Sequence, residues 1–131
     1  MPRAFAAISY LQGSPGGSFG GSPTGATLNG NGQTIDVLGA ESAQQLEVQE
    51  TAGGTATLTL QGSFDGNTWY AAGYQQVDGI AAPTRSIAPI AIAANAKHVY
   101  QILDPYPQLQ AVLSAVAGGA TVIARVYQIG S

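Results

Sequence analysis

Strict alternation of apolar and polar residues in the middle of the chain is the feature that most constrains its fold. Leu46 and Val48 alternate with glutamine and glutamate, and Ala56, Leu58 and Leu60 alternate with threonine. A period of two places the apolar residues on one face of an extended strand, and β-branched threonine favours the strand from the other face. These segments therefore predict half-buried β-strands that share one apolar core.

Further short β-rich runs follow along the chain. They cover residues 35–38, 69–70, 75–77, 87–92, 99–103 and 121–129. Pro89 interrupts one of these runs, and because proline donates no ladder hydrogen bond we expect that run at a sheet edge or a bulge. About seven to eight short strands at this spacing, with no helix required, predict an all-β fold, an antiparallel β-sandwich or small barrel.

Two glycine pairs determine the connections that we expect. Gly53-Gly54 separates the two alternating runs described above, and Gly118-Gly119 separates the last two β-rich segments. Because glycine adopts the positive φ angles of tight turns, each pair predicts an antiparallel hairpin. The segment from Gln108 to Ala117 is ambiguous, since its apolar residues also fit the spacing of a helix, but the adjoining hairpin signal favours a strand.

The first 32 residues differ in composition from the rest of the chain. No charged residue occurs between Ala4 and Ile35, and the stretch from Gly13 to Gly32 is rich in glycine. Because glycine is costly to order, this segment is not expected to fold by itself. We therefore expect an extended Gly/Ser/Pro-rich N-terminal arm over residues 1–32 and a β-sandwich domain over residues 33–131 that folds without it. The arm is either a flexible leader or a strap that binds a partner through apolar anchors, namely Phe5, Ile8, Tyr10, Leu11 and Phe19.

Charge and cysteine content argue against several classes of function. The chain has four Lys and Arg against seven Asp and Glu, a net charge of −3, which leaves too few cations for extensive contact with nucleic acid phosphates. It contains no cysteine and one histidine, so thiolate and histidine-rich metal sites are excluded, and we expect no cofactor. No apolar run approaches the roughly 18 residues that span a membrane, and the N-terminus is a poor secretory signal.

No combination of residues predicts catalysis, and we expect that the protein is not an enzyme. His98 follows Lys97 in a predicted strand and is expected to be a surface or hydrogen-bonded residue. The seven carboxylates are scattered, and no Gly-x-Ser-x-Gly motif is present. Asp65-Gly66-Asn67 is similar to part of a calcium loop, but further acidic ligands are far away along the chain. We expect these three residues to form a structural, metal-free turn.

The aromatic residues leave a binding function open. Trp69, Tyr70, Tyr74 and Tyr106 could stack on sugar rings, as in carbohydrate-binding modules. In a chain with few large side chains, however, the single tryptophan is more simply explained as a core or interface residue.

One segment resembles a known group of proteins. The run Leu60-Gln61-Gly62-Ser63-Phe64-Asp65-Gly66-Asn67-Thr68-Trp69-Tyr70 is similar to the Gly-Ser-x-Asp-Gly-x-x-Trp pattern in small β-sandwich domains of tailed-bacteriophage virion proteins. The part from Leu109 to Ser114, with Gly118 to Val122 after it, resembles the final hairpin of the same domains. The resemblance covers roughly residues 34–129, and the Ala- and Pro-rich region 80–96 departs from it.

The resemblance implies a non-enzymatic virion component. We expect a capsid decoration or cement protein on the capsid surface, which binds the major capsid protein or other virion proteins and stabilises the head lattice through its sandwich and N-terminal arm. Such a protein is expected to be a homo-oligomer, for example a trimer. A tail, fibre or baseplate accessory domain of the virion and a carbohydrate-binding module are the alternatives.

Overall fold

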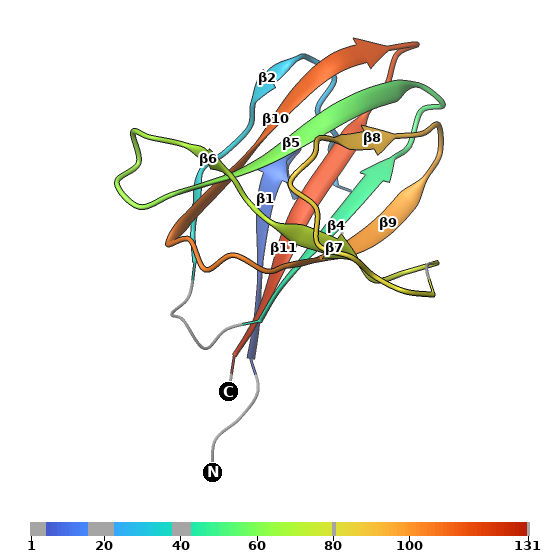
Figure 1. Cartoon of the computed structure of the whole chain (residues 1–131). Coiled ribbons are helices and arrows are strands. Elements are labelled where there is room, and N and C mark those ends of the chain that lie inside the picture. The colour runs from blue at the N-terminus through green and yellow to red at the C-terminus, as the bar shows by residue number, and fades with distance from the viewer. Residues whose placement is uncertain (1–4, 16–22, 38–42, 80, 131) are drawn as a thin grey trace.

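The computed structural model describes residues 5–15, 23–37, 43–79 and 81–130. Within them, the secondary-structure elements are all β-strands. Eleven strands form two antiparallel sheets that pack face to face (Figure 1). The predicted all-β antiparallel sandwich is confirmed, but the described residues contain eleven strands instead of about seven to eight. Five of the eleven have only two or three residues and lie at sheet edges. Two strands, Phe5–Gln12 and Gly30–Asn31, lie outside every run that the sequence predicted, in the segment expected to be an arm.

The first sheet has five strands in the order β1-β11-β4-β9-β7. Their bounds are β1 Phe5–Gln12, β11 Val122–Gly130, β4 Ala43–Glu50, β9 Lys97–Ile102 and β7 Tyr74–Gln76. The two longest pairings in this sheet are β1 with β11 and β11 with β4, and the first of them joins segments from opposite ends of the chain.

The second sheet is built on two long central strands with short strands at both edges. Its order is β2-β10-β5-β6, with β3 also paired to β10 and β8 also paired to β5. The bounds are β2 Gly30–Asn31, β10 Gln108–Ala117, β5 Thr55–Ser63, β6 Tyr70–Ala71, β3 Ile35–Asp36 and β8 Ile90–Ile92. The edge position predicted from Pro89 is confirmed, because β8 pairs with β5 alone. The strand prediction for Gln108 to Ala117 is confirmed as well.

The core lies between the two sheets and consists of the inward residues of the alternating strands. Along β5, the inward Ala56, Leu58 and Leu60 are buried, whereas the threonines between them are half-buried. Small residues such as Ala111 and Ala124 are fully buried in the central strands. The largest fully buried apolar side chains are Leu11, Leu46, Leu58, Leu109, Leu113, Val122 and Val126.

Both predicted glycine hairpins are wrong. Gly53-Gly54 joins β4 to β5, and Gly118-Gly119 joins β10 to β11, but in each case the two strands belong to different sheets. Each connection passes from one sheet to the other, and the two lie next to each other. A Cβ added to Gly54 would lie 2.4 Å from the carbonyl oxygen of Ala117. Alternation shows which side chains face the core, but not which sheet a strand joins, because strands of both sheets face the same core.

The predicted boundary between an arm and a sandwich domain at residues 32 and 33 is also wrong. β1 pairs with β11 along its whole length, and Leu11 is fully buried in the core. Ser14 pairs with Thr24, and Ala26 with Val122, so the described part of the glycine-rich region is held by backbone hydrogen bonds. A neutral segment needs no charged contacts to join a sheet, because backbone pairing satisfies its polar groups.

Candidate interaction surfaces

The predicted anchors of the N-terminal arm lie in different environments. Ile8 has 54% of its surface exposed, Tyr10 is half-buried and Leu11 is fully buried. The backbone of Phe5 pairs with Gly130 in the sheet, and Phe19 lies outside the described residues. Of these anchors, the structure therefore brings Ile8 and Tyr10 to one surface, the outer face of the five-stranded sheet.

An arginine-centred cluster lies on that outer face. Arg125 donates from Nη2 and Nε to Glu47 Oε1, at 2.7 and 2.9 Å, and from Nη1 to the Tyr10 hydroxyl at 3.2 Å. Its guanidinium lies 5.9 Å from the ring centre of Tyr10 and 5.7 Å from that of Tyr127. Burial alone lowers the pKa of Arg125, but its hydrogen bonds to Glu47 and Tyr10 outweigh this effect and raise it. Lys97 Nζ lies 3.7 Å from Glu47 Oε2, so the two cations of the cluster, Arg125 and Lys97, share one carboxylate.

Uncharged amides continue the same face. Gln45 lies opposite Gln101 in the β4–β9 pairing, and Gln101 lies opposite Gln75 in the β7–β9 pairing. Gln75 Nε2 donates to Gln101 Oε1 at 2.9 Å. Together with the arginine-centred cluster, these residues form a surface of hydrogen-bonding and aromatic groups without an unpaired charge among the residues named.

Asp65, Gly66 and Asn67 form a turn after β5. Asp65 Oδ1 accepts hydrogen bonds from the backbone N–H of Asn67 at 2.8 Å and of Thr68 at 2.9 Å, and these bonds lower the pKa of Asp65. Ser63 Oγ accepts from the Gly66 N–H at 2.8 Å, and Gly66 has a φ of +80°. The Asp65 carboxylate thus holds the turn itself. Among the described residues, no group of three or more His, Cys, Asp or Glu could hold a metal ion.

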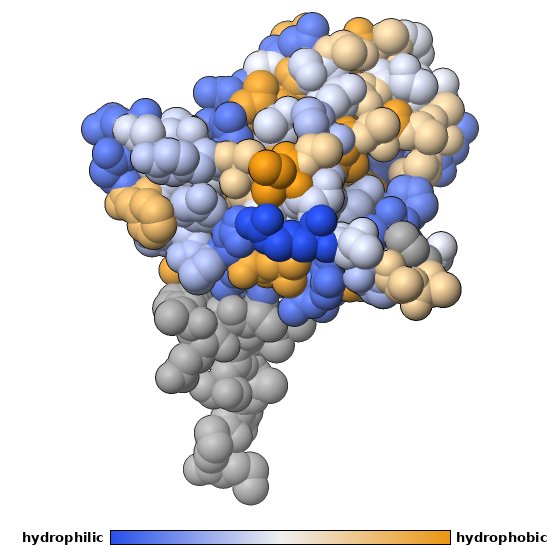
Figure 2. Space-filling model, in the orientation of Figure 1, coloured by the Kyte–Doolittle hydropathy of each residue, from blue (hydrophilic) through white to orange (hydrophobic). Residues whose placement is uncertain are grey.

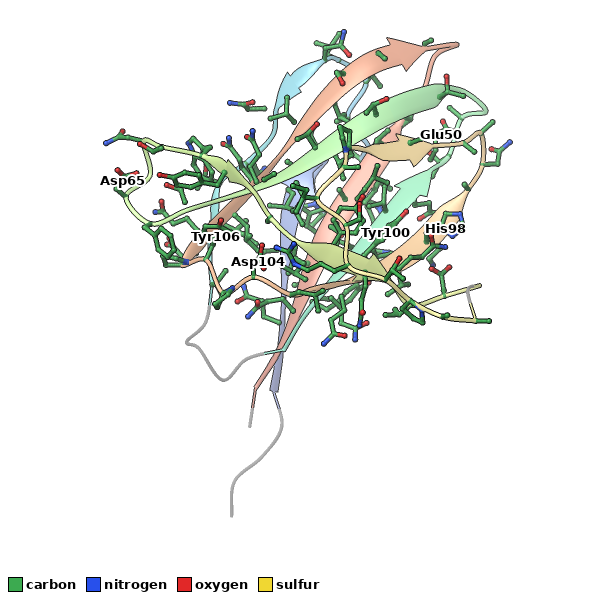
Figure 3. All side chains as sticks on the ribbon, in the orientation of Figure 1. Glu50, Asp65, His98, Tyr100, Asp104 and Tyr106 are labelled. Carbon is green, nitrogen blue, oxygen red and sulfur yellow. The ribbon has the colours of Figure 1, made fainter. Side chains whose placement is uncertain are left out.

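Three aromatic rings gather beside this turn, and Figure 3 shows Tyr106 on the same side of the sandwich as Asp65. Tyr106 lies over Gly62, where an added Cβ would come within 2.1 Å of the ring. Tyr70 is nearly parallel to Tyr106, with ring centres 6.3 Å apart, and Phe64 lies 5.1 Å from Tyr106. Phe64 is 71% exposed and Tyr70 is 50% exposed. The sequence analysis identified Tyr70 and Tyr106 as candidate binding residues but missed Phe64. Its position in a predicted turn, next to Asp65, could have indicated that Phe64 is exposed.

The other two aromatic candidates are separate from this group. Tyr74 is buried, packs edge-to-face on Tyr100 at 5.4 Å and donates its hydroxyl to the Ala88 carbonyl at 2.6 Å. Trp69 is half-buried just before β6. The four aromatic residues therefore do not form one sugar-binding platform.

A cleft of about 280 Å³ opens at the edge of the sandwich between β7, β8 and β9. Its walls include Tyr74, Gln76, Ser86, Ile90 and Tyr100. Burial raises the pKa of Tyr100 to about 12, so its phenol is neutral at ordinary pH. The walls named here thus offer apolar surface and neutral polar groups.

Two further acidic residues, Asp78 and Asp104, are engaged in structural contacts. Asp78 Oδ1 accepts the Val99 N–H at 2.8 Å, and Asp78 Oδ2 lies 3.1 Å from His98 Nδ1. Asp104 Oδ2 accepts the Gly73 N–H at 2.6 Å and a hydrogen bond from Arg85 at 2.9 Å. The prediction that His98 is a surface or hydrogen-bonded strand residue is confirmed, because it lies half-buried in β9 beside Asp78.

Apolar residues on the viewed face of the molecule are interspersed with hydrophilic ones (Figure 2). In the described part of the chain, no helix is long and apolar enough to cross a membrane.

Comparison with known proteins gives a likeness of fold. No family model matches the sequence, and no curated protein matches it. The crystal structure of the SPBc2 prophage-derived protein YomS is similar, with a TM-score of 0.66 over 99% of this chain and 97% of that chain. The two sequences are 10% identical over this match. The two chains therefore share a fold along nearly their whole lengths.

Proposed function

We propose that the protein is a non-enzymatic structural component of a bacteriophage particle. The observation that carries this proposal is the fold shared with a prophage-derived protein across 99% of this chain and 97% of the other. The strand-turn-strand motif at residues 60–70, which resembles virion β-sandwich domains, supports the same conclusion from the sequence.

The contacts of the carboxylates favour binding over catalysis. Glu47 pairs with Arg125, Glu50 accepts backbone N–H groups, and Asp65 holds its own turn. Asp78 and Asp104 each fix backbone N–H groups of neighbouring segments. Because a catalytic acid or base must be available to a substrate proton, carboxylates engaged in this way are better suited to holding a rigid scaffold.

The more specific role that we propose is capsid decoration, in which many copies bind the head lattice. The outer face of the five-stranded sheet is suited to close contact with another protein, because its charged groups are already paired with each other and its glutamines can hydrogen-bond. In a symmetric lattice, weak contacts of this kind add up across many copies. A tail, fibre or baseplate accessory role uses the same surface chemistry and differs in copy number.

Quantitation of purified particles tests the proposal. Particles of the phage that encodes the chain are purified on a density gradient, and the protein is quantified against the major capsid protein by gel or mass spectrometry. Roughly hundreds of copies per particle support decoration, and a few to a few dozen indicate a tail position. Absence from the particles at every purification step would refute a structural role in the virion.

Binding of a neutral saccharide is a second candidate function, favoured by the exposed rings of Phe64 and Tyr70 beside Tyr106. The isolated protein should then be retained on immobilised polysaccharide, and Tyr70→Ala should abolish retention. Ile87→Ala, at a residue 53% exposed, is the matched control. Equal retention of both variants, or no retention of the unmodified protein, would exclude this function.

A further inference from the structure

The sandwich has four sheet edges, and the chain protects three of them. On the second sheet, the edges carry β2 and β3 on one side and β6 and β8 on the other, all two or three residues long, and Pro89 directly precedes β8. On the first sheet, β7 has three residues, and its Tyr74 also exchanges backbone hydrogen bonds with Ser86. Short strands and proline are the usual means by which proteins prevent edge-to-edge association.

Among the residues that the structure describes, no strand pairs with the outer side of the fourth edge, β1. It is eight residues long and pairs with β11 on one side. On its other side, the hydrogen bond from Gln33 N–H to the Leu11 carbonyl, at 2.9 Å, lies at the far end of the strand. The stretch Phe5-Ala6-Ala7-Ile8-Ser9-Tyr10 contains no charge, no proline and no glycine. A long, uncharged edge strand is a template for a further strand.

We propose that this edge pairs antiparallel with β1 of a second copy of the chain, which joins two five-stranded sheets into one. A strand can pair with its own copy where no like charges oppose each other, and β1 carries none between residues 5 and 12. The pairing also covers Ile8, which is 54% exposed in the single chain. This inference goes beyond the proposed role in a particle and does not depend on it.

Two-fold symmetry restricts the register of the pair. The outer face of the joined sheet is continuous only if each residue of that face lies opposite a residue of the same face in the second copy. The pairing of β1 with β11 within one chain follows this rule, since Ile8 lies opposite Tyr127 and Tyr10 opposite Arg125. The register that places Ile8 opposite Ile8 of the second copy also places the large Tyr10 opposite the small Ala6. The pairing is then the same on either side of the two-fold axis.

Cysteine cross-linking tests the register directly, because the chain has no cysteine of its own. Residues directly opposite each other across two strands have Cβ atoms about 4.5–5.5 Å apart, near enough for a disulfide after small adjustments. Ile8→Cys is therefore expected to give a disulfide-linked dimer on mild oxidation. Leu28→Cys, at another apolar residue that is 78% exposed, is the matched control and should remain mostly monomeric. Equal cross-linking of the two variants would overturn the register.

Sedimentation measurements on the unmodified chain and on charge variants test the pairing itself. The mass of the unmodified chain should rise with concentration from 13.2 kDa towards twice that value. Ile8→Lys and Ile8→Glu should each weaken the dimer roughly tenfold or more, because two like charges then face each other, and an equimolar mixture should recover it. Leu28→Lys should leave dimerisation unchanged, and far-UV circular dichroism checks that each variant is folded.

Three results would overturn the proposal. One is a monomer at every concentration, which would mean that the β1 edge does not pair with a second copy and is available to a strand of a different protein. Another is a trimer, because an antiparallel pair of edges closes with two copies. The third is a mixture of Lys and Glu variants that associates no better than either alone. If a charge variant fails to fold, the result for Ile8→Cys decides.

Discussion

Glu50 connects three loops at one end of the sandwich, and its removal should have a large effect that depends on pH. Glu50 is 1% exposed, and Figure 3 shows it near one end of the sandwich. Oε1 accepts hydrogen bonds from the N–H groups of Gly53 and Asn95, both at 2.8 Å, and Oε2 from those of Ala52 at 2.7 Å and Thr121 at 3.1 Å. These donors belong to the β4–β5, β8–β9 and β10–β11 connections. A single carboxylate thus satisfies four backbone groups in three loops.

The pKa of Glu50 gives a limit for its contribution to stability. Burial by itself raises this pKa, but the four backbone hydrogen bonds outweigh it and lower the pKa from 4.5 to about 2. This difference corresponds to at most about 3 kcal/mol of folding free energy at neutral pH. Because loop backbone covers the carboxylate near the surface, solvent screens its interactions and we expect about 2 kcal/mol. The contribution is complete above the unfolded-state pKa and is lost as the pH falls from about 4.5 to about 2.

Glu50→Gln tests this reasoning. The amide keeps one acceptor oxygen, and its NH₂ group faces two backbone N–H groups that then lack a partner. The variant should lose about 2 kcal/mol of unfolding free energy at pH 7, and less than about half of that at pH 3, where the unfolded-state carboxyl is mostly protonated. Urea unfolding followed by Trp69 fluorescence and circular dichroism, in steps from pH 7 to pH 3, measures the difference.

Asp36→Asn is the matched control, since Asp36 is exposed and its carboxylate accepts a long hydrogen bond of 3.4 Å from Gln108 Nε2. It should change the unfolding free energy by less than about 0.5 kcal/mol. A Glu50→Gln effect equally large at pH 3 and pH 7, or no larger than that of Asp36→Asn, would refute the role assigned to the carboxylate.

Three further substitutions test other parts of the structure by urea or thermal unfolding. Leu11→Ala should lower the unfolding free energy by about 2–5 kcal/mol because Leu11 is fully buried; a loss below about 0.5 kcal/mol would show that β1 is not part of the core. Gly62→Val should destabilise the protein by about 1–3 kcal/mol, because an added Cβ would meet the Tyr106 ring at 2.1 Å, and an unchanged midpoint would contradict this contact. Gly66→Val should cost about 1–3 kcal/mol because Gly66 has a φ of +80°, whereas Gly66→Asn should cost less; equal losses would argue against backbone strain.

Local chemistry in the sequence was sufficient for several elements. The alternation of leucine and threonine predicted β5 and the face that it buries, because side chains of a strand point to opposite faces with a period of two. Pro89 predicted an edge position, because a residue without an N–H cannot pair on both sides. The strand period and the proline rule each depend only on residues that are neighbours along the chain, so both can be applied to the sequence alone.

The candidate surfaces were only partly visible in the sequence. Tyr70 and Tyr106 were identified by residue type, but their stacking depends on Gly62, which leaves room for a ring over the strand. The contact between Arg125 and Glu47 joins residues 78 positions apart, and the contact between Arg125 and Tyr10 joins residues 115 positions apart. No local pattern predicts such partners, because they follow from which strands are neighbours.

By itself, the sequence determined that the chain forms antiparallel strands around one core, since residue type and period decide which side chains leave water. The tertiary structure alone decided that Gly53-Gly54 and Gly118-Gly119 cross between the sheets, and that β1 is a sheet strand and not a separate arm. Those outcomes depend on backbone hydrogen bonds, which every residue except proline can make and which therefore carry little sequence signature. Partners for these bonds are chosen by the packing of the whole core, and only the folded chain shows that choice.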